Sequence, residues 1–350
     1  MVTITHEIFR AAYDVPLTIS RGTTTHADLF WLHWAEDGVT GTGEGRAFSV
    51  GVVAYTIEQM IAALEAARPW LETASAWDRR TVEARLRAEK APPPLIAAVN
   101  LAHHDWIARR KGVSLRKLWG APSRPGALNT ATIGIGDAAA VRARIARWLE
   151  MGDFRAFKVK LGSPAGIAAD QVQFEAVRAS VPAGSRLSVD ANGGWSLADA
   201  KTMARWLADF GIDYLEQPLA QGREEELAEL HGVCAVPLLI DESCTSAAAV
   251  ARWAAHIDGV NIKLLKVGGL DAAAAIAATA KAHGLQVLVG CYGESSLGNT
   301  AAATLGSYAD HFDLDSHLNL AADPYEGLRL EAGRLVLPDH PGIGAVRAAR

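Results

Sequence analysis

The chain is poor in cysteine, with three such residues in 350 and none spaced from another as metal ligands are. So few thiols exclude a disulfide framework and are typical of a reducing compartment. No apolar run is long enough to span a bilayer, and the opening residues MVTITHEIFR lack the basic and apolar regions of a secretion signal. We therefore expect a cytoplasmic protein without a membrane partner.

The chain also has no large excess of positive or negative charge. The 34 basic and 39 acidic residues leave a net charge of -5, and no basic stripe is present. A nucleic-acid partner is therefore not expected. The chain is 50% hydrophobic and 21% charged, which is typical of a folded globular protein. This composition is compatible with a homo-oligomer but does not predict one.

The first third of the chain changes from strand-like to helix-like patterning. Residues 1 to about 50 alternate as antiparallel strands do, and the turn at 36–38, between LFWLHW and VTGTGEG, predicts a hairpin. From about 51 to 119 the apolar spacing is helical, and three consecutive prolines at 92–94 separate two of the helices. The segment APSRPGA, residues 121–127, is expected to be a linker.

Beyond the linker, short apolar segments alternate with Ala/Leu-rich helical segments at intervals of about 22 to 30 residues. The apolar segments lie near residues 130, 158, 188, 215, 239, 261, 288 and 313. Eight strands that alternate with helices at this spacing predict a parallel barrel. An open doubly wound sheet is the structural alternative.

Charged side chains occupy the C-terminal ends of six of these strands, on the face opposite the aliphatic residues. In AFKVKL, Lys158 and Lys160 point one way and Val159 points the other. A solvated edge strand would explain one such pair of lysines. Six repetitions instead favour an active site, because barrel enzymes carry theirs at the C-terminal ends of the strands.

Three acids from consecutive strands predict a metal site: Asp190, Glu216 and Asp241. Neighbouring carboxylates repel one another unless a cation lies among them. A ligand set made only of oxygen favours Mg²⁺, with Mn²⁺ as the alternative. For any one of these acids alone, a salt bridge or a helix cap would be the simpler explanation.

Lysines flank this trio in the sequence and indicate proton transfer. A divalent ion can stabilise the enediolate that forms when a proton leaves the carbon next to a carboxylate. We expect Lys160 and Lys263 to act on opposite faces of the substrate, and Lys158 to hold Lys160 in its neutral, basic form. Lys266 is at odd spacing from Lys263, so we expect it to point elsewhere or to lie past the strand as a supporting charge.

Five motifs together resemble the enolase superfamily, in its muconate-lactonizing subgroup: KVK at 158–160, DAN at 190–192, EQP at 216–218, DES at 241–243 and NIKLLKVGG at 261–269. The resemblance implies a (β/α)7β barrel over 126–322, below an α+β capping domain over 1–120 that residues 323–350 complete. It also implies that the acid trio binds Mg²⁺, that Lys160 and Lys263 are the catalytic acid/base pair, and that Asn192 supports the site.

Within the subgroup, Asp313-Leu314-Asp315 resembles the dipeptide epimerases, whose paired aspartates receive the free ammonium of the substrate. The resemblance implies epimerisation at the α-carbon of the C-terminal residue, with L-Ala-D/L-Glu from peptidoglycan turnover as the expected dipeptide. Arg21, in a segment that resembles the flexible cap loop, and Glu294 are assigned to substrate binding. A surface position for Arg21 and a helix-capping role for the two aspartates are the alternatives.

Two segments depart from the pattern of the relatives, at residues 45–50 and 291–294. Both contact the substrate side chain in the relatives, so the preferred dipeptide stays open, as does any contact of Arg21 or Arg46 with it. Related alternatives are N-acyl amino acid racemase, o-succinylbenzoate synthase and muconate cycloisomerase, whose substrates lack the free ammonium. Alternatives of other classes are a Schiff-base aldolase that uses a barrel lysine and a non-catalytic binding protein.

Overall fold

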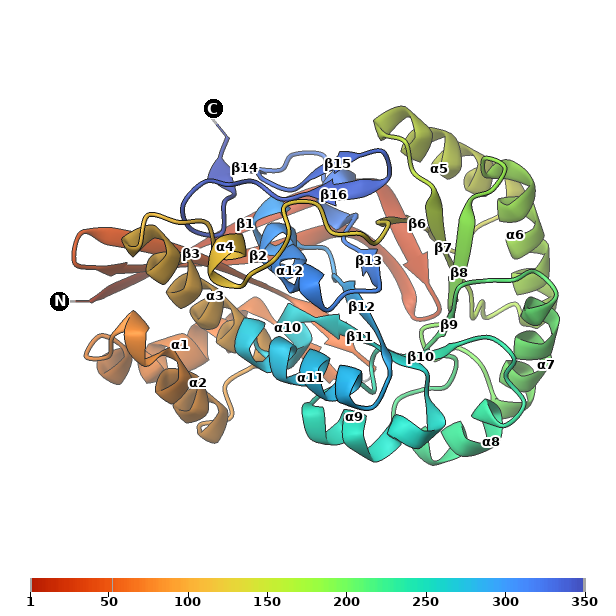
Figure 1. Cartoon of the computed structure of the whole chain (residues 1–350), viewed down its shortest axis with the longest axis horizontal. Coiled ribbons are helices and arrows are strands. Elements are labelled where there is room, and N and C mark those ends of the chain that lie inside the picture. The colour runs from red at the N-terminus through yellow and green to blue at the C-terminus, as the bar shows by residue number, and fades with distance from the viewer. Residues whose placement is uncertain (1, 52, 349–350) are drawn as a thin grey trace.

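The computed structural model describes residues 2–51 and 53–348. Met1, Val52 and the last two positions of the predicted capping domain therefore lie outside the described residues. The secondary structure falls into two parts: an N-terminal antiparallel sheet with its helices, and a ring of parallel strands surrounded by helices (Figure 1).

The N-terminal part begins with three antiparallel strands in the order β1 (Thr3–Ile19), β2 (Gly22–Glu36) and β3 (Val39–Arg46). Glu36 pairs with Val39 across a tight turn, so the predicted hairpin is confirmed. A second, smaller hairpin consists of β4 (Phe48–Val50) and β5 (Val53–Tyr55). Four helices follow: α1 (Ile57–Leu71), α2 (Arg79–Ala88), α3 (Pro93–Arg110) and α4 (Leu115–Leu118).

Helix α3 is the central helix of this part and is buried at every residue from 94 to 108. It begins at Pro93, where a fixed φ and a missing N–H suit the first turn of a helix. The predicted break at the prolines is therefore confirmed. Because neighbours surround it, α3 shows no single apolar stripe.

Alternate glycines on β3 let α3 lie directly against the sheet. A Cβ atom added to Gly41, Gly43 or Gly45 would lie 2.1, 1.9 or 2.5 Å from a carbonyl oxygen of α3. Strand alternation puts these three residues on the same face. The sheet and the helix therefore meet backbone to backbone, and any side chain at these positions would separate them.

The C-terminal part contains eight parallel strands that are hydrogen-bonded in chain order: β6 (Thr130–Ile133), β7 (Ala156–Lys160), β8 (Arg186–Asp190), β9 (Leu215–Glu216), β10 (Leu238–Ile240), β11 (Gly259–Lys263), β12 (Gln286–Gly290) and β13 (His311–Asp313). A parallel bridge between Asn129 and Phe312 joins the last strand to the first. The predicted barrel is therefore confirmed, and the doubly wound alternative is wrong because the strand order never reverses.

All seven connections between these eight strands carry helices, which form the outer ring in Figure 1. These helices are α5 (Ala138–Met151), α6 (Ile167–Ser180), α7 (Leu197–Ala208), α8 (Leu227–His231), α9 (Ala247–Trp253), α10 (Leu264–Val267) with α11 (Leu270–Ala282), and α12 (Ser296–Ala303). Among the described residues, no helix combines the length and the apolar character that a membrane span requires.

After β13 the chain returns to the N-terminal part. It forms two short strand pairs, β14 (Tyr325–Glu326) with β17 (Val346–Arg347) and β15 (Arg329–Glu331) with β16 (Arg334–Val336). The backbone N–H of Leu115 donates to Gly342 over 2.6 Å, and that of Ile343 donates to the buried Asp105 carboxylate over 2.6 Å. The C-terminal residues are thus fastened to α3 and α4.

Glu44 on β3 joins the N-terminal part to the barrel. Its buried carboxylate accepts hydrogen bonds from the Trp31 indole over 2.8 Å and from the Ser295 backbone N–H over 2.9 Å. Ser295 is the N-cap of α12, at the end of the loop that follows β12. Burial raises the pKa of Glu44 to about 7. This link holds the sheet against the mouth of the barrel.

We predict that Gly43→Ala lowers the free energy of unfolding by about 1–3 kcal/mol or more, because its Cβ would meet the Ala98 carbonyl oxygen at 1.9 Å. Urea unfolding followed by tryptophan fluorescence measures the change. Gly126→Ala is the matched control, since a Cβ there meets nothing within 4 Å. Equal midpoints for the two variants would contradict the proposed close packing.

Candidate active site

The order of the barrel strands determines which charged side chains lie opposite one another. Strands four places apart in an eight-stranded barrel lie across from one another. Lys160 ends β7, the second strand, and Lys263 ends β11, the sixth, so the two amines face each other. The acid trio comes from the three strands between them, and Asp313 ends β13, the strand opposite β9.

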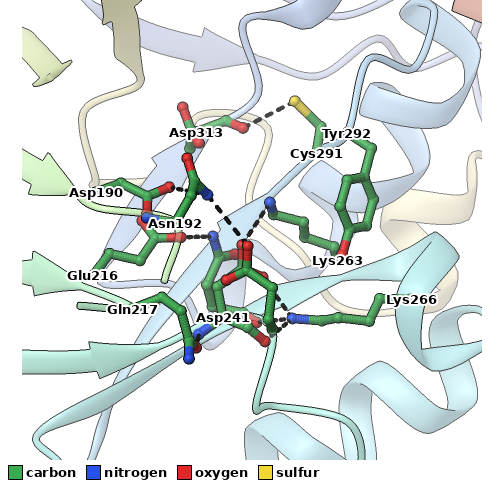
Figure 2. A network of polar contacts seen from close by, with 12 residues as sticks. Asp190, Asn192, Glu216, Gln217, Asp241, Lys263, Lys266, Cys291, Tyr292 and Asp313 are labelled. Carbon is green, nitrogen blue, oxygen red and sulfur yellow. Dashed lines mark hydrogen bonds and ion pairs between the residues drawn. The ribbon is translucent and has the colours of Figure 1, made fainter. Parts of the chain in front are cut away.

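The three predicted metal ligands converge and are buried (Figure 2). One carboxylate oxygen each of Asp190, Glu216 and Asp241 lies within 4.8 Å of the other two. In the described part of the chain this is the only group of three or more His, Cys, Asp or Glu side chains with such spacing. Burial and repulsion from Asp190 raise the pKa of Glu216 to about 7, so the trio favours an added positive charge.

The surroundings of the trio fit a hard divalent cation. The side-chain oxygens Asn192 Oδ1, Glu242 Oε2 and Asn261 Oδ1 are buried and have no hydrogen-bond partner within the described structure. Asn192 and Asn261 also donate to the trio, to Asp190 over 3.0 Å and to Glu216 over 2.6 Å. Carboxylates with spare oxygen acceptors around them are the donor set that Mg²⁺ prefers.

Each acid of the trio also pairs with at least one lysine. Nζ–O distances are 3.0 Å for Lys158–Glu216, 2.6 Å for Lys160–Asp190, 2.8 Å for Lys263–Asp241 and 2.6 Å for Lys266–Asp241. Burial acts against the charge of Asp241, yet its two lysines hold the pKa of that carboxyl far below its usual range. All the predicted lysines therefore meet at the barrel mouth.

Lys158 is the most deeply placed of these lysines, with no exposed surface. Its ammonium pairs with Glu216 on one side and with Asp313 on the other. Burial opposes the charge, but the two carboxylates outweigh burial and raise the pKa of Lys158 well above its usual range. Lys158 is thus a fixed cation between the two acids, and its effect on Lys160 stays a prediction.

Lys263 is held by a similar balance. Burial opposes its charge, and the Asp241 carboxylate outweighs burial and raises the pKa of Lys263. Lys266 lies in α10, past the end of β11, as the spacing predicts. Its ammonium nevertheless turns back to Asp241, and it also donates to the backbone oxygen of Asn261 over 3.1 Å.

Asn192, which follows β8, and Gln217, which follows β9, have left-handed backbone conformations, with φ of 43° and 37°. Such strain in residues other than glycine is concentrated at functional sites. Gln217 Oε1 accepts from the backbone N–H of Asp241 over 2.8 Å and so orients that ligand. In the sequence, Gln217 is recognisable only as part of the EQP motif, and this role was not predicted.

Asp313 and Asp315 lie together opposite the trio, and both line a small recess with Lys160 and Tyr13. Thr130 donates to Asp313 over 2.9 Å, and the backbone N–H of Thr132 donates to Asp315 over 2.7 Å. Burial and the neighbouring charge of Asp313 raise the pKa of Asp315 to about 6.

The remaining predicted substrate-binding residues have protein partners. Arg21 lines the main cavity, but its guanidinium pairs with Glu242 over 2.8 Å and donates to the Asn192 backbone oxygen. The Glu294 carboxylate accepts from the backbone N–H groups of Tyr292 and Gly293, so it holds its own loop and does not line the cavity. A direct contact of either side chain with substrate stays a prediction.

Arg46 is buried and directed at the backbone. It donates to the backbone oxygens of Ala47 and Tyr292 over 3.0 and 2.8 Å, and to the Tyr13 hydroxyl over 3.1 Å. These bonds tie the end of β3 to the loop after β12. In this arrangement Arg46 shapes the cavity wall.

The cavity between the two parts has a volume of about 560 Å³. Lys160 and Lys263 line its floor. Its apolar and aromatic lining comes mainly from the N-terminal strands and from the loop after β12: Leu17, Ile19, Phe48, Tyr55 and Tyr292. The two facing lysines and the apolar residues therefore line one continuous cavity.

Two family models match consecutive parts of the chain. Residues 2–120 match the mandelate racemase/muconate lactonizing enzyme N-terminal domain, and residues 140–347 match the enolase C-terminal domain-like family. The chain belongs to the enolase superfamily. The family expected from the motifs is confirmed.

The chain is similar to several dipeptide epimerases of this superfamily. The hydrophobic dipeptide epimerase of Roseobacter litoralis is 42% identical over 332 residues, which cover 95% of each chain. One from a Flavobacteria bacterium is 40% identical and covers 94% of each. The crystal structure of the Cytophaga hutchinsonii dipeptide epimerase, complexed with Mg and D-Ala-L-Val, has a TM-score of 0.92 at 25% identity, over 99% of this chain and 96% of that one.

We predict that Asp190→Asn weakens Mg²⁺ binding by more than about tenfold, or about 1.4 kcal/mol, because it removes one of three converging carboxylates. Isothermal titration calorimetry with Mg²⁺ alone measures the affinity. Glu150→Gln, which removes an exposed acid remote from the trio, is the control. Equal affinities for the wild type and Asp190→Asn would count against the trio as the metal site.

Proposed function

We propose that this superfamily member is a Mg²⁺-dependent dipeptide epimerase that inverts the α-carbon of the C-terminal residue. The observation that carries the proposal is the pair of amines, Lys160 and Lys263, that face each other from strands four places apart. Inversion requires a group on each face of the carbon, whereas a Schiff-base aldolase needs one nucleophilic lysine.

In one direction Lys160 takes the α-proton and Lys263 delivers a proton to the opposite face; in the other direction the roles exchange. Lys158, two residues before Lys160 on the same face, is a fixed ammonium that pairs with Glu216 and Asp313. Asp190, Glu216 and Asp241 would hold Mg²⁺, which when bound neutralises charge that develops on the substrate carboxylate.

Asp313 and Asp315 supply the second anchor. They lie across the barrel from the trio, so a dipeptide can present its carboxylate to one side and its ammonium to the other. N-acyl amino acids and muconate have no ammonium to offer. This pair of acids therefore favours free dipeptides over the substrates of the racemase, o-succinylbenzoate synthase and cycloisomerase alternatives.

The cavity lining supports an apolar side chain on the C-terminal residue. Phe48, Tyr55 and Tyr292 contribute aromatic rings, and Leu17 and Ile19 contribute aliphatic surface. Two relatives named hydrophobic dipeptide epimerase are 42% and 40% identical and a third is 27% identical, whereas two named L-Ala-D/L-Glu epimerase are 33% and 31% identical. L-Ala-D/L-Glu, with a role in peptidoglycan peptide metabolism, is the second candidate, because Arg21 lies on the cavity wall.

We predict that the enzyme with Mg²⁺ incorporates one deuterium from D₂O into L-Ala-L-Xaa dipeptides, fastest for apolar Xaa. Mass spectrometry of a dipeptide pool measures the uptake. Lys160→Ala and Lys263→Ala should each stop epimerisation, and each should still exchange the α-proton of one enantiomer. If Ala-Glu takes up deuterium fastest, L-Ala-D/L-Glu would replace the apolar dipeptides as the preferred substrate. Exchange only in N-succinyl amino acids would replace the dipeptide assignment.

We predict that Asp315→Asn raises KM for free dipeptides by about tenfold and affects N-acetylated dipeptides much less, because the acetyl group removes the ammonium. With the pKa of Asp315 at about 6, more of this carboxyl is ionised as the pH rises through 6. Free dipeptides should therefore bind better above pH 6 than below it, and the variant should lose that dependence. An equal effect on both substrate types would remove the assigned role.

A further inference from the structure

We propose that Tyr292 is a positioning residue for Lys263, and that its ring fixes the amine that serves one face of the substrate. This inference rests on the proposed function and adds a residue whose role the motifs do not contain. Tyr292 follows β12, the strand next to β11, and it lines the cavity beside Lys263 (Figure 2).

The contact with Lys263 is made by the face of the ring. Lys263 Nζ lies 4.3 Å from the ring centroid of Tyr292 and 2.8 Å from the Asp241 carboxylate. A cation over an aromatic face is attracted to it, most strongly where water is excluded. Since Lys263 is 4% exposed, the ring and the carboxylate together determine where the amine lies.

The Tyr292 ring is itself held from the N-terminal part. It stacks on Phe48 of β4 with centroids 4.1 Å apart and 24° between the ring planes, and Phe48 contacts Tyr55 of β5 at 5.4 Å. Its backbone oxygen accepts from Arg46 over 2.8 Å, and its backbone N–H donates to Glu294 over 2.5 Å. Side chain and backbone are thus both restrained, so the ring is a firm support for the amine.

The hydroxyl is not part of this support. Tyr292 OH is buried and has no hydrogen-bond partner among the described residues. The ring alone therefore accounts for the contact with Lys263, and phenylalanine should replace tyrosine in this role. The two facing lysines differ in this respect. In the described part of the chain Lys263 has an aromatic ring over its ammonium and Lys160 does not.

The test compares Tyr292→Leu with Tyr292→Phe in single-enantiomer exchange of the α-proton with D₂O. The face that Lys263 serves is identified by the enantiomer that Lys263→Ala no longer exchanges. Tyr292→Leu should slow exchange of that enantiomer by about tenfold relative to the other, and Tyr292→Phe should keep the wild-type ratio. Tyr308→Leu, which removes a partly buried tyrosine ring that does not line the cavity, is the matched control and should leave the ratio unchanged.

A second readout does not depend on turnover. In protein labelled with ¹³C-lysine, the ε-CH₂ signal of Lys263, assigned with Lys263→Ala, should show a ring-current shift in the wild type and in Tyr292→Phe that Tyr292→Leu loses. Exchange that falls equally for both enantiomers, a Tyr292→Phe enzyme that behaves like Tyr292→Leu, or an unmoved lysine signal would overturn the proposal. If the wild type exchanges no dipeptide, the proposed function fails, and the lysine signal still decides whether the ring positions Lys263.

Discussion

Charge compensation inside the barrel mouth is the constraint on which the rest of the site depends. An unpaired buried charge costs several kcal/mol, so each buried lysine needs an acid at ion-pair distance. Lys158 shows this best, because it has no exposed surface and pairs with acids on opposite sides of the barrel, Glu216 and Asp313. That one ammonium links the acid trio to Asp313, one of the two aspartates proposed to receive the substrate ammonium.

The N-terminal part gives this charged site its walls. The glycines of β3 let α3 approach the sheet closely, and Glu44 on the same strand binds the N-cap of α12 at the mouth of the barrel. Arg46, two residues later, ties the strand to the loop that carries Tyr292. One short strand therefore serves both packing and the site. The acids and lysines come from the barrel, while most of the apolar cavity lining comes from β1, β4 and β5.

Much of the fold was predictable because its signals are local. Alternation along the strands placed Lys160, Asp190 and Lys263 on the inner face, and the spacing of apolar segments predicted all eight barrel strands. Partners distant in sequence were not predictable in this way. Neither the double pairing of Lys158 nor the hydrogen bond from the Asp241 backbone to Gln217 leaves a periodic trace. Tyr292 stood out in the sequence only as a departure from the relatives, without a role.

The sequence by itself determined the order of strands and helices, the residue types available for chemistry and the face of each strand on which they lie. These follow from backbone periodicity and turn chemistry, which act over a few residues. Only the tertiary structure decided which charges pair, because closure of the barrel brings the last strand beside the first and so places Asp313 next to Lys158. It also decided that Arg21 meets Glu242 and that Phe48 stacks on the Tyr292 ring, since both contacts require the N-terminal part to be seated on the barrel.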